Sequence, residues 1–181
     1  HLRIFVDSPM AIKVGKVFKH HPHLFDDEAR KLMRNYRASN ITLTRSVADS
    51  KSINHIRGTA IIIAGSGMCT GGRIKHHLVT NIERPESTVL FVGYQAQNTL
   101  GRLIVDGKEE VRILGEMYQV KARVEKLSGF SAHADKIELM RWLDSISNTP
   151  RRVFVTHGEP KAAKAHAENI RSQKGWQVEI P

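Results

Sequence analysis

Hydrophobic positions in the first 107 residues alternate between short apolar runs and longer amphipathic stretches. The runs are rich in β-branched and aromatic residues, which indicates strands, and the stretches repeat apolar residues at helical spacing. The predicted strands cover residues 2–7, 41–44, 59–65 and 87–94, and the predicted helices cover residues 10–21, 26–36, 46–54, 72–83 and 99–107. This β-α alternation predicts an α/β fold with a largely parallel sheet flanked by helices. The continuously apolar runs 59–65 and 87–94 predict strands that are buried on both faces.

The pattern changes after residue 107. Residues 111–130 contain two strand-like runs with only a short break between them, which predicts an antiparallel ribbon. A helix over 134–146, a strand over 151–157, a helix over 161–173 and a last strand follow. We therefore expect one domain over residues 1–107 and a second α/β segment over residues 108–181.

Composition limits the class of protein. The 181 residues are 40% hydrophobic, enough for one or two compact units with a real core. The single cysteine, Cys69, excludes an internal disulfide and fits a reducing compartment, so we expect a cytoplasmic protein. The longest strongly apolar run, 60–64, is too short to span a bilayer, and we expect no membrane partner. Because the chain opens on His1 and a strand, we expect it to begin inside a larger protein.

The charge is strongly basic, with a formal net charge of +10 and a pI of about 10.0. Residues 1–60 carry 11 Lys/Arg against 5 Asp/Glu, and residues 61–181 carry 17 against 13. An excess concentrated in this way favours a polyanionic partner, nucleic acid above all. The alternative is a basic domain whose charge serves only solubility.

A glycine-rich stretch, GSGMCTGGR (65–73), lies between a predicted strand and a predicted helix. Glycines at such a junction let backbone N–H groups approach an anion, and Arg73 could add a phosphate contact. The stretch matches neither the P-loop nor GxGxxG, so a tight turn that needs glycine for steric reasons explains it equally well. Cys69 has no paired cysteine or histidine near it, and we read it as chemically inert.

Two histidine clusters look like metal motifs but lack the remaining ligands. His21 and His23 flank a proline, and the positions that would complete a His-x-His-x-Asp-His site hold Phe25 and Asp26. We therefore predict a solvent-facing turn at residues 20–27. The adjacent histidines 76 and 77, in a predicted helix, have no metal partner four residues away, so we predict that they face the surface or RNA.

Another pair of histidines has a more specific setting. His133, in SGFSAHAD, precedes a predicted helix, and His157, in VTHGEP, follows a predicted strand. Each has an acid two residues on, Asp135 or Glu159. Imidazoles at strand ends with acids to orient them suit metal ligation and general acid catalysis, although each one alone is more often a hydrogen-bonded turn residue.

Five stretches together carry a resemblance that covers nearly the whole chain. They are FVDSPMA (5–11), GSGMCTGGR (65–73), VGYQAQNTLGR (92–102), SGFSAHAD (128–135) and VTHGEP (155–160). Their order resembles that of β-CASP nucleases, metallo-β-lactamase-fold enzymes that process RNA. The resemblance implies that residues 1–107 are the β-CASP domain. It also implies that residues 108–181 are the C-terminal segment of the metallo-β-lactamase domain, of the RNA-metabolising type.

The resemblance also implies roles for single residues. His133 matches the histidine that contacts the scissile phosphate as general acid, Glu159 is an orienting catalytic residue, and His157 matches a zinc ligand. The residues implied to bind RNA or its phosphates are Ser8, Ser66, Gly67, Gly71, Gly72, Arg73, Arg102 and Ser131. The chain departs from the pattern at Asn98, where the relatives carry glycine.

The zinc-binding signature of the family, His-x-His-x-Asp-His, does not occur in these 181 residues. We therefore expect two zinc ions in an intact parent and none tightly bound by this chain. The resulting hypothesis is a fragment of a zinc-dependent ribonuclease that hydrolyses RNA phosphodiester bonds in RNA processing or decay and is inactive by itself. Its expected partners are single-stranded RNA and the N-terminal metallo-β-lactamase half, and a homo-oligomer stays open.

Two alternatives belong to other classes. One is a non-catalytic RNA-binding module, and the other is an α/β domain that binds a mononucleotide through residues 65–73.

Overall fold

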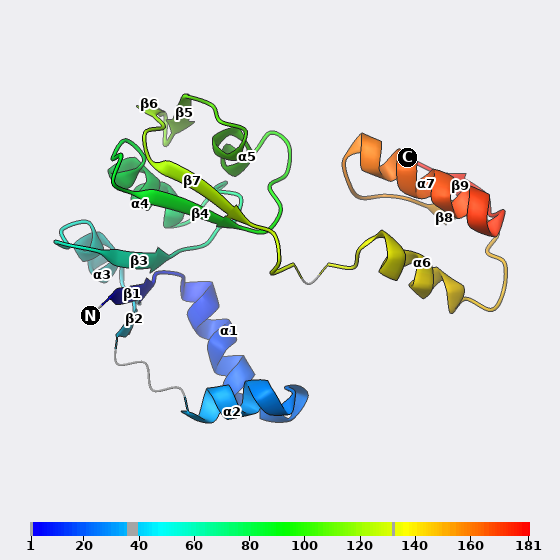
Figure 1. Ribbon diagram of the computed structural model, residues 1–181, viewed down its shortest axis with the longest axis horizontal. Coiled ribbons are helices and arrows are strands. Elements are labelled where there is room, and N and C mark those ends of the chain that lie inside the picture. The colour runs from blue at the N-terminus through cyan, green and yellow to red at the C-terminus, as the bar shows by residue number, and fades with distance from the viewer. Residues whose placement is uncertain (1, 36–39, 132) are drawn as a thin grey trace. The chain divides into compact units, whose positions relative to one another are not determined.

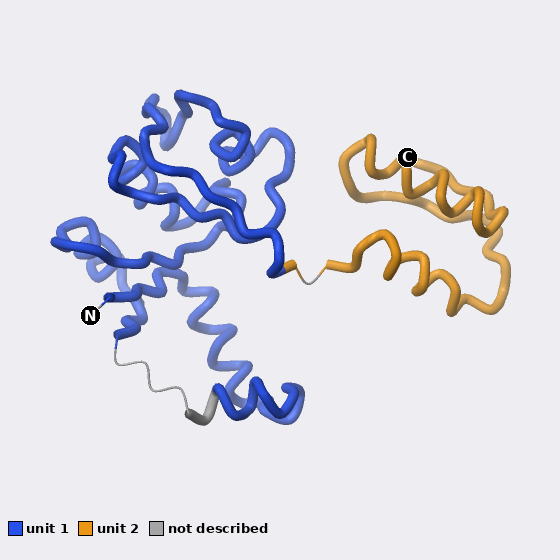
Figure 2. Tube along the Cα trace, in the orientation of Figure 1, with its two compact units in different colours: residues 1–130 blue, residues 131–181 orange. Residues whose placement is uncertain are grey.

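The computed structural model describes residues 2–35, 40–131 and 133–181. The chain divides into two compact units, residues 1–130 and 131–181 (Figures 1 and 2). The predicted boundary at 107–108 falls inside the first unit, at the turn before β5 (Glu110–Ile113). No helix in the described ranges is long and apolar enough to cross a membrane.

A three-stranded parallel sheet opens the first unit. Its central strand β1 (Arg3–Val6) lies between β2 (Ile41–Leu43) and β3 (Ala60–Ile63). The chain leaves β1 through α1 (Pro9–His20), a 3₁₀ turn (Pro22–Leu24) and α2 (Asp27–Asn35), and it joins β2 to β3 through α3 (Val47–Ile53). Parallel neighbours need such crossover connections, and all three strands therefore end at the same edge of the sheet (Figure 1).

The rest of the first unit combines a parallel pair with a hairpin. Strand β4 (Thr88–Val92) pairs in parallel with β7 (Arg123–Leu127), and β5 pairs antiparallel with β6 (Glu116–Gln119). Helices α4 (Ile74–Asn81) and α5 (Leu100–Val105) flank β4 in the sequence. The predicted ribbon over 111–130 is thus correct only as far as Gln119, because β7 leaves the hairpin and joins β4.

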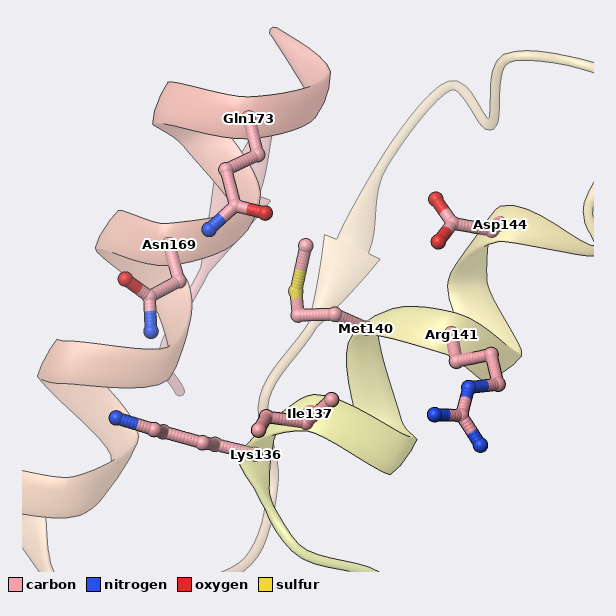
Figure 3. Close-up of a pocket in the computed structure, with 7 residues that line it drawn as sticks. All are labelled: Lys136, Ile137, Met140, Arg141, Asp144, Asn169 and Gln173. Atoms are coloured by element: carbon pink, nitrogen blue, oxygen red, sulfur yellow. The ribbon is translucent and has the colours of Figure 1, made fainter.

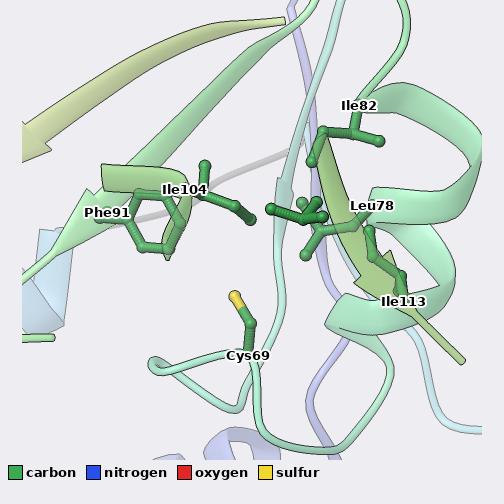
Figure 4. Close-up of a cluster of buried hydrophobic side chains, with 7 residues drawn as sticks. Cys69, Leu78, Ile82, Phe91, Ile104 and Ile113 are labelled. Carbon is green, nitrogen blue, oxygen red and sulfur yellow. The ribbon is translucent and has the colours of Figure 1, made fainter. Parts of the chain in front are cut away.

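The largest core cluster of the first unit gathers side chains from the segment between residues 69 and 113 (Figure 4). Its buried members are Cys69, Leu78, Ile82, Phe91, Ile104, Val111 and Ile113. The cluster holds α4, β4, α5 and β5 together, and Cys69 extends it under the glycine-rich loop. Burial of these apolar side chains is the main stabilising contribution in this unit.

The prediction that 59–65 and 87–94 are buried on both faces is wrong. In β3, Ile61 and Ile63 are 43% and 51% exposed, and in β4, Leu90 and Val92 are 51% and 54% exposed, whereas Phe91 is 3% exposed. Alternate residues of a strand point to opposite faces, so β4 buries Phe91 on one face, β3 is only partly covered on one face, and both strands leave the other face open. An unbroken apolar run does not distinguish this arrangement from burial on both faces.

The second unit is a small α/β structure. It runs α6 (Lys136–Asp144), β8 (Val153–Phe154), α7 (Pro160–Lys174) and β9 (Val178–Glu179), with β8 and β9 parallel. A capping box starts α6, in which Asp135 accepts from the N–H groups of the first turn and Glu138 accepts from the N–H of Asp135. The core residues of this unit are Leu143, Ala167, Ile170, Trp176 and Val178. Both units confirm the predicted α/β class with mostly parallel sheets.

Candidate nucleic-acid interface

A buried carboxylate ties the end of β1 to two helices. Asp7 follows β1 directly and is fully buried. Its Oδ1 accepts from Nη1 of Arg73 at 2.6 Å, and its Oδ2 accepts from Oγ of Ser50 and Nε2 of His77, each at 2.6 Å. Ser50 lies on α3, His77 lies on α4, and Arg73 is the residue that precedes α4. The strand end that positions Ser8 is therefore fixed by one charged group.

The hydrogen bonds determine the protonation state of this carboxylate. Burial raises the pKa of Asp7, but the hydrogen bonds from Ser50, His77 and Arg73, with the positive charge of Arg73, outweigh burial and bring the pKa below its usual 3.8. Asp7 is thus ionised at neutral pH. An ionised group out of contact with water requires this number of donors to remain stable.

The prediction that His77 faces the surface or RNA is wrong. Its side chain is 5% exposed, and Nε2 donates to the ionised carboxylate of Asp7. Nδ1 is buried and has no hydrogen-bond partner among the residues that the structure describes. The neighbouring His76 is exposed, as predicted. The partner of His77 lies seventy positions earlier in the sequence, so no local pattern could reveal the pair.

Arg73 also faces inward. Besides Asp7, its guanidinium donates to the backbone carbonyls of Thr44 and Arg45, each at 3.1 Å. These bonds anchor the last residue of the glycine-rich loop to the segment after β2. The phosphate contact expected of Arg73 stays a prediction, and the geometry gives this arginine a positioning role first.

The structure brings Ser8 and the glycine-rich loop together. Oγ of Ser8 accepts from the N–H of Ala11 at the start of α1, and it lies 3.4 Å from the place where a Cβ on Gly65 would be. Gly72 has φ +75°, and a Cβ there would lie 2.7 Å from the carbonyl oxygen of Gly65. The loop thus folds tightly back on its own start, and Gly72 is required for this turn.

At two other positions of the loop, no steric constraint requires glycine. A Cβ on Gly67 or Gly71 would meet no atom within 4 Å, and neither residue has a positive φ. Gly67 is exposed and Gly71 is partly exposed. The fold of the described residues therefore accounts for Gly72 but leaves Gly67 and Gly71 free to carry a side chain.

A second stretch of the resemblance packs against this loop. The N–H of Gly101 donates to the carbonyl of Met68 at 3.0 Å, and Gln95, which is buried, lies where a Cβ on Gly101 would point. Arg102, one residue on, pairs through Nε with both carboxylate oxygens of Asp106 at 2.8 Å. Residues 92–102 and 65–73 thus pack directly against each other.

The departure at Asn98 preserves the backbone of this stretch. Asn98 has φ +63°, the left-handed region that glycine adopts most readily. Asparagine is among the few other residues that enter this region often. The substitution therefore keeps the turn that leads into α5.

Cys69, at the base of the loop, is a core residue. Its side chain is 2% exposed, and burial raises its pKa to about 11, with a small opposing effect of Lys75. The thiol is protonated at neutral pH, and only the thiolate is a nucleophile. The prediction that Cys69 is chemically inert is confirmed.

The two histidines singled out in the sequence both lie in the second unit, at matching places. Each is exposed and stands two residues before the N-cap of a helix: His133 before Asp135 and α6, His157 before Glu159 and α7. Nδ1 of His133 lies 3.2 Å from Oγ of Ser131, which also accepts from the N–H of His133.

Asp135 has a different partner from the one expected. Its Oδ1 accepts from the N–H groups of Ile137 and Glu138, and these bonds lower its pKa. It caps α6, and Ser131 is the side chain that orients His133. The sequence missed this pair because a serine two residues before a histidine is not a distinctive pattern.

The described residues do not form a zinc site. Across residues 2–35, 40–131 and 133–181, no three His, Cys, Asp or Glu side chains come close enough together to hold a metal ion. His21 and His23 contact each other edge to face at 5.7 Å between ring centroids, and both are exposed, as the predicted solvent-facing turn requires. Any zinc chemistry would need ligands from outside this set.

Comparison with known sequences now identifies the class. Residues 1–104 match the Beta-Casp domain, and residues 117–181 match the Zn-dependent metallo-hydrolase RNA specificity domain. The chain belongs to the β-CASP family of metallo-hydrolases, which confirms the resemblance drawn from the five stretches.

The individual relatives are larger proteins. Ribonuclease TTHA0252 of Thermus thermophilus is 37% identical over 160 residues, which is 86% of this chain and 36% of the relative. Transcription termination factor FttA of Pyrococcus abyssi is 36% identical over 143 residues, 75% of this chain and 22% of the relative. FttA of Thermococcus kodakarensis is 34% identical over 145 residues, with shares of 76% and 22%. The chain thus spans about a third of the ribonuclease and about a fifth of the termination factors.

Proposed function

We propose that this chain is the RNA-holding part of a β-CASP ribonuclease and that it binds single-stranded RNA along Ser8, the 65–73 loop and Arg102. The observation that carries the proposal is the pair of glycines with no steric role, Gly67 and Gly71. Glycine lowers the stability of a loop unless the conformation or a close approach requires it. Close approach of a phosphate backbone to loop N–H groups supplies such a requirement.

Two further facts support this choice of ligand. The net charge of +10 favours a polyanion, and the segment 117–181 matches a domain described by RNA specificity. A relative covering 86% of the chain is named a ribonuclease. Arg73 and Arg102 are each paired with a carboxylate, which offsets most of their charge, and Ser8 is only 7% exposed. In this proposal the direct phosphate contacts therefore come mainly from Ser66 and loop N–H groups, with Ser8 at the base of the loop.

The catalytic part of the proposal needs the remainder of a metallo-β-lactamase domain. In that assembly His133, held by Ser131, donates a proton to the leaving oxygen of the cleaved RNA, and Glu159 orients its neighbours. His157 serves as a metal ligand. The chain alone, without a three-ligand cluster among its described residues, binds RNA without cutting it.

The experiment measures binding of a fluorescein-labelled single-stranded RNA by anisotropy over a series of salt concentrations. For the wild-type chain, each neutralised phosphate contributes a slope of about −0.7 in log K against log salt. Gly67→Asp and Gly71→Asp place a carboxylate where the open space is, and one unit charge at about 4 Å from a phosphate is enough to weaken binding about tenfold. Circular dichroism checks that the fold persists.

Ser147→Asp is the matched control, because it makes the same change of charge at an exposed position outside the loop. We expect its effect on affinity to stay within about twofold. Wild-type binding that is absent or independent of salt overturns the proposal, and so does an equal loss in the loop variants and the control. A titration with AMP separates the mononucleotide alternative, which predicts that AMP binds as tightly as the RNA strand.

A further inference from the structure

A shallow pocket of about 370 Å³ lies within the second unit, between α6 and α7 (Figure 3). It is separate in sequence from the loop surface proposed above and contains neither His133 nor His157. Its lining residues are Lys136, Ile137, Met140, Arg141, Asp144, Asn169 and Gln173.

The lining combines an apolar floor with polar groups from both helices. Met140 projects into the space between the helices, and Lys136 reaches from α6 toward α7. Asn169 and Gln173 line the pocket from α7. They are four residues apart, so they share one helix face, and their amides can act on one ligand together.

These amides have free hydrogen-bonding capacity. Neither the side chain of Asn169 nor that of Gln173 forms a hydrogen bond with the residues that the structure describes. Asp144, the one acid in the lining, pairs with Lys174, which lies outside it. The pocket therefore offers two unused amides and the charges of Lys136 and Arg141 around a thioether.

We propose that this pocket binds one nucleotide of a single-stranded RNA, an inference that rests on the proposed function. Asn and Gln amides form paired hydrogen bonds with the donor and acceptor atoms on base edges. A methionine sulfur packs favourably against an aromatic ring, and a lysine ammonium suits a phosphate. The base lies against Met140, its edge meets Asn169 and Gln173, and its phosphate meets Lys136.

The site would give sequence preference to a protein whose loop surface contacts only the RNA backbone. Backbone contacts position a strand, and base contacts specify it. The pocket lies wholly within the segment 117–181 that matches the RNA specificity domain.

The test uses the full 181-residue chain and compares homopolymeric RNA 12-mers with an abasic strand of the same length. Side-chain amide signals of Asn169 and Gln173, followed by ¹⁵N NMR, should shift with one of the homopolymers and stay in place with the abasic strand. The double variant Asn169→Ala/Gln173→Ala should lose about tenfold in affinity for the preferred RNA, reducing it to the level of the others. Lys136→Ala should lower the salt slope by about 0.7 without changing base preference.

Controls come from the same unit. Asn148→Ala/Gln177→Ala removes two exposed amides outside the pocket, and Lys164→Ala removes one exposed charge on α7. If the wild type binds RNA but the pocket variants match these controls, or if the amide signals move equally with the abasic strand, the pocket proposal fails and the loop proposal stands. If the wild type binds no RNA, both fail.

Discussion

Asp7 is the residue on which the loop surface depends most. It is the only carboxylate among the fully buried side chains of the described residues, and three donors from α3 and the start of α4 converge on it. Removing its charge leaves Arg73, which is 17% exposed, without an ionic partner. Removing one partner of a buried ion pair destabilises the fold more than replacing both partners with apolar residues, because the remaining charge stays buried without compensation.

We predict that Asp7→Asn lowers the free energy of unfolding at pH 7 by about 2–4 kcal/mol, somewhat below the range for fully buried pairs because Arg73 is partly exposed. The folded-state pKa of Asp7 is lowered below 3.8, so its contribution is complete above that pH and is lost as pH falls through the folded value. Urea unfolding of the wild type and of Asp7→Asn from pH 7 to pH 2 measures the difference between their free energies of unfolding. The contributions of the other carboxylates are common to both proteins and cancel in this difference. A gap that persists unchanged to the acid end contradicts the assignment.

The Asp7 network also shows where sequence reasoning stops. Stretch 5–11 and stretch 65–73 were both recognised from their residues, but nothing local indicated that Asp7 binds Arg73 and His77. Whether side chains about seventy positions apart meet depends on the order of the strands in the sheet. Here β1, which precedes Asp7, lies next to β3, which precedes the loop that ends at Arg73. The contact shows that His77 is buried rather than surface-facing, and it gives Arg73 a positioning role, while a phosphate contact of Arg73 stays a prediction.

At the scale of elements, the hairpin β5–β6 carries a strained turn. Its two connecting residues, Leu114 and Gly115, have φ +51° and +99°. Two-residue hairpins favour this geometry because its twist matches that of the strands, and they normally place Asn-Gly there. A leucine in the left-handed region costs about 1–2 kcal/mol.

We therefore predict that Leu114→Asn raises the free energy of unfolding by about 1 kcal/mol. The side chain of Leu114 is 53% exposed, so little apolar burial is lost. Thermal and urea unfolding measure the change. Leu114→Ala is the matched control: it removes the same apolar atoms but keeps the unfavourable backbone conformation, and it should give no gain. Equal stabilisation by both substitutions points to the exposed side chain, rather than the turn, as the source of strain.

Most elements could be predicted because their signals are local. The capping serines and acids, the prolines at the starts of α1 and α7 and the alternation of strand and helix all lie within a few residues of the elements they define. Two things could not be read in this way. Whether β3 and β4 are covered on one face or both depends on distant helices, and the partner of β7 depends on a strand thirty-five residues earlier, β4.

At the scale of the whole molecule, the proposed roles divide between the two compact units. The loop surface with Ser8, Arg73 and Arg102 belongs to residues 1–130, and His133 and His157 belong to residues 131–181. The pocket proposed to read a base also lies in residues 131–181. The proposed backbone binding therefore belongs mainly to the first unit, and the proposed base selection and proton transfer belong to different side chains of the second, so separate variants can test each.

The last prediction concerns metal binding by the whole chain. A catalytic zinc normally takes three protein ligands and a water, and the described residues bring no three such side chains together. We predict that the purified chain, loaded with zinc and dialysed, retains well under one equivalent at His157, as measured by elemental analysis of the wild type and His157→Ala. The two proteins should match. Zinc held weakly by the exposed turn at residues 20–23 should be lost equally from both, and His21→Ala/His23→Ala identifies that fraction. Retention of about one equivalent that disappears only in His157→Ala would mean that this chain completes a metal site by itself, and its proposed role as a partner of a metal-binding half would have to be abandoned.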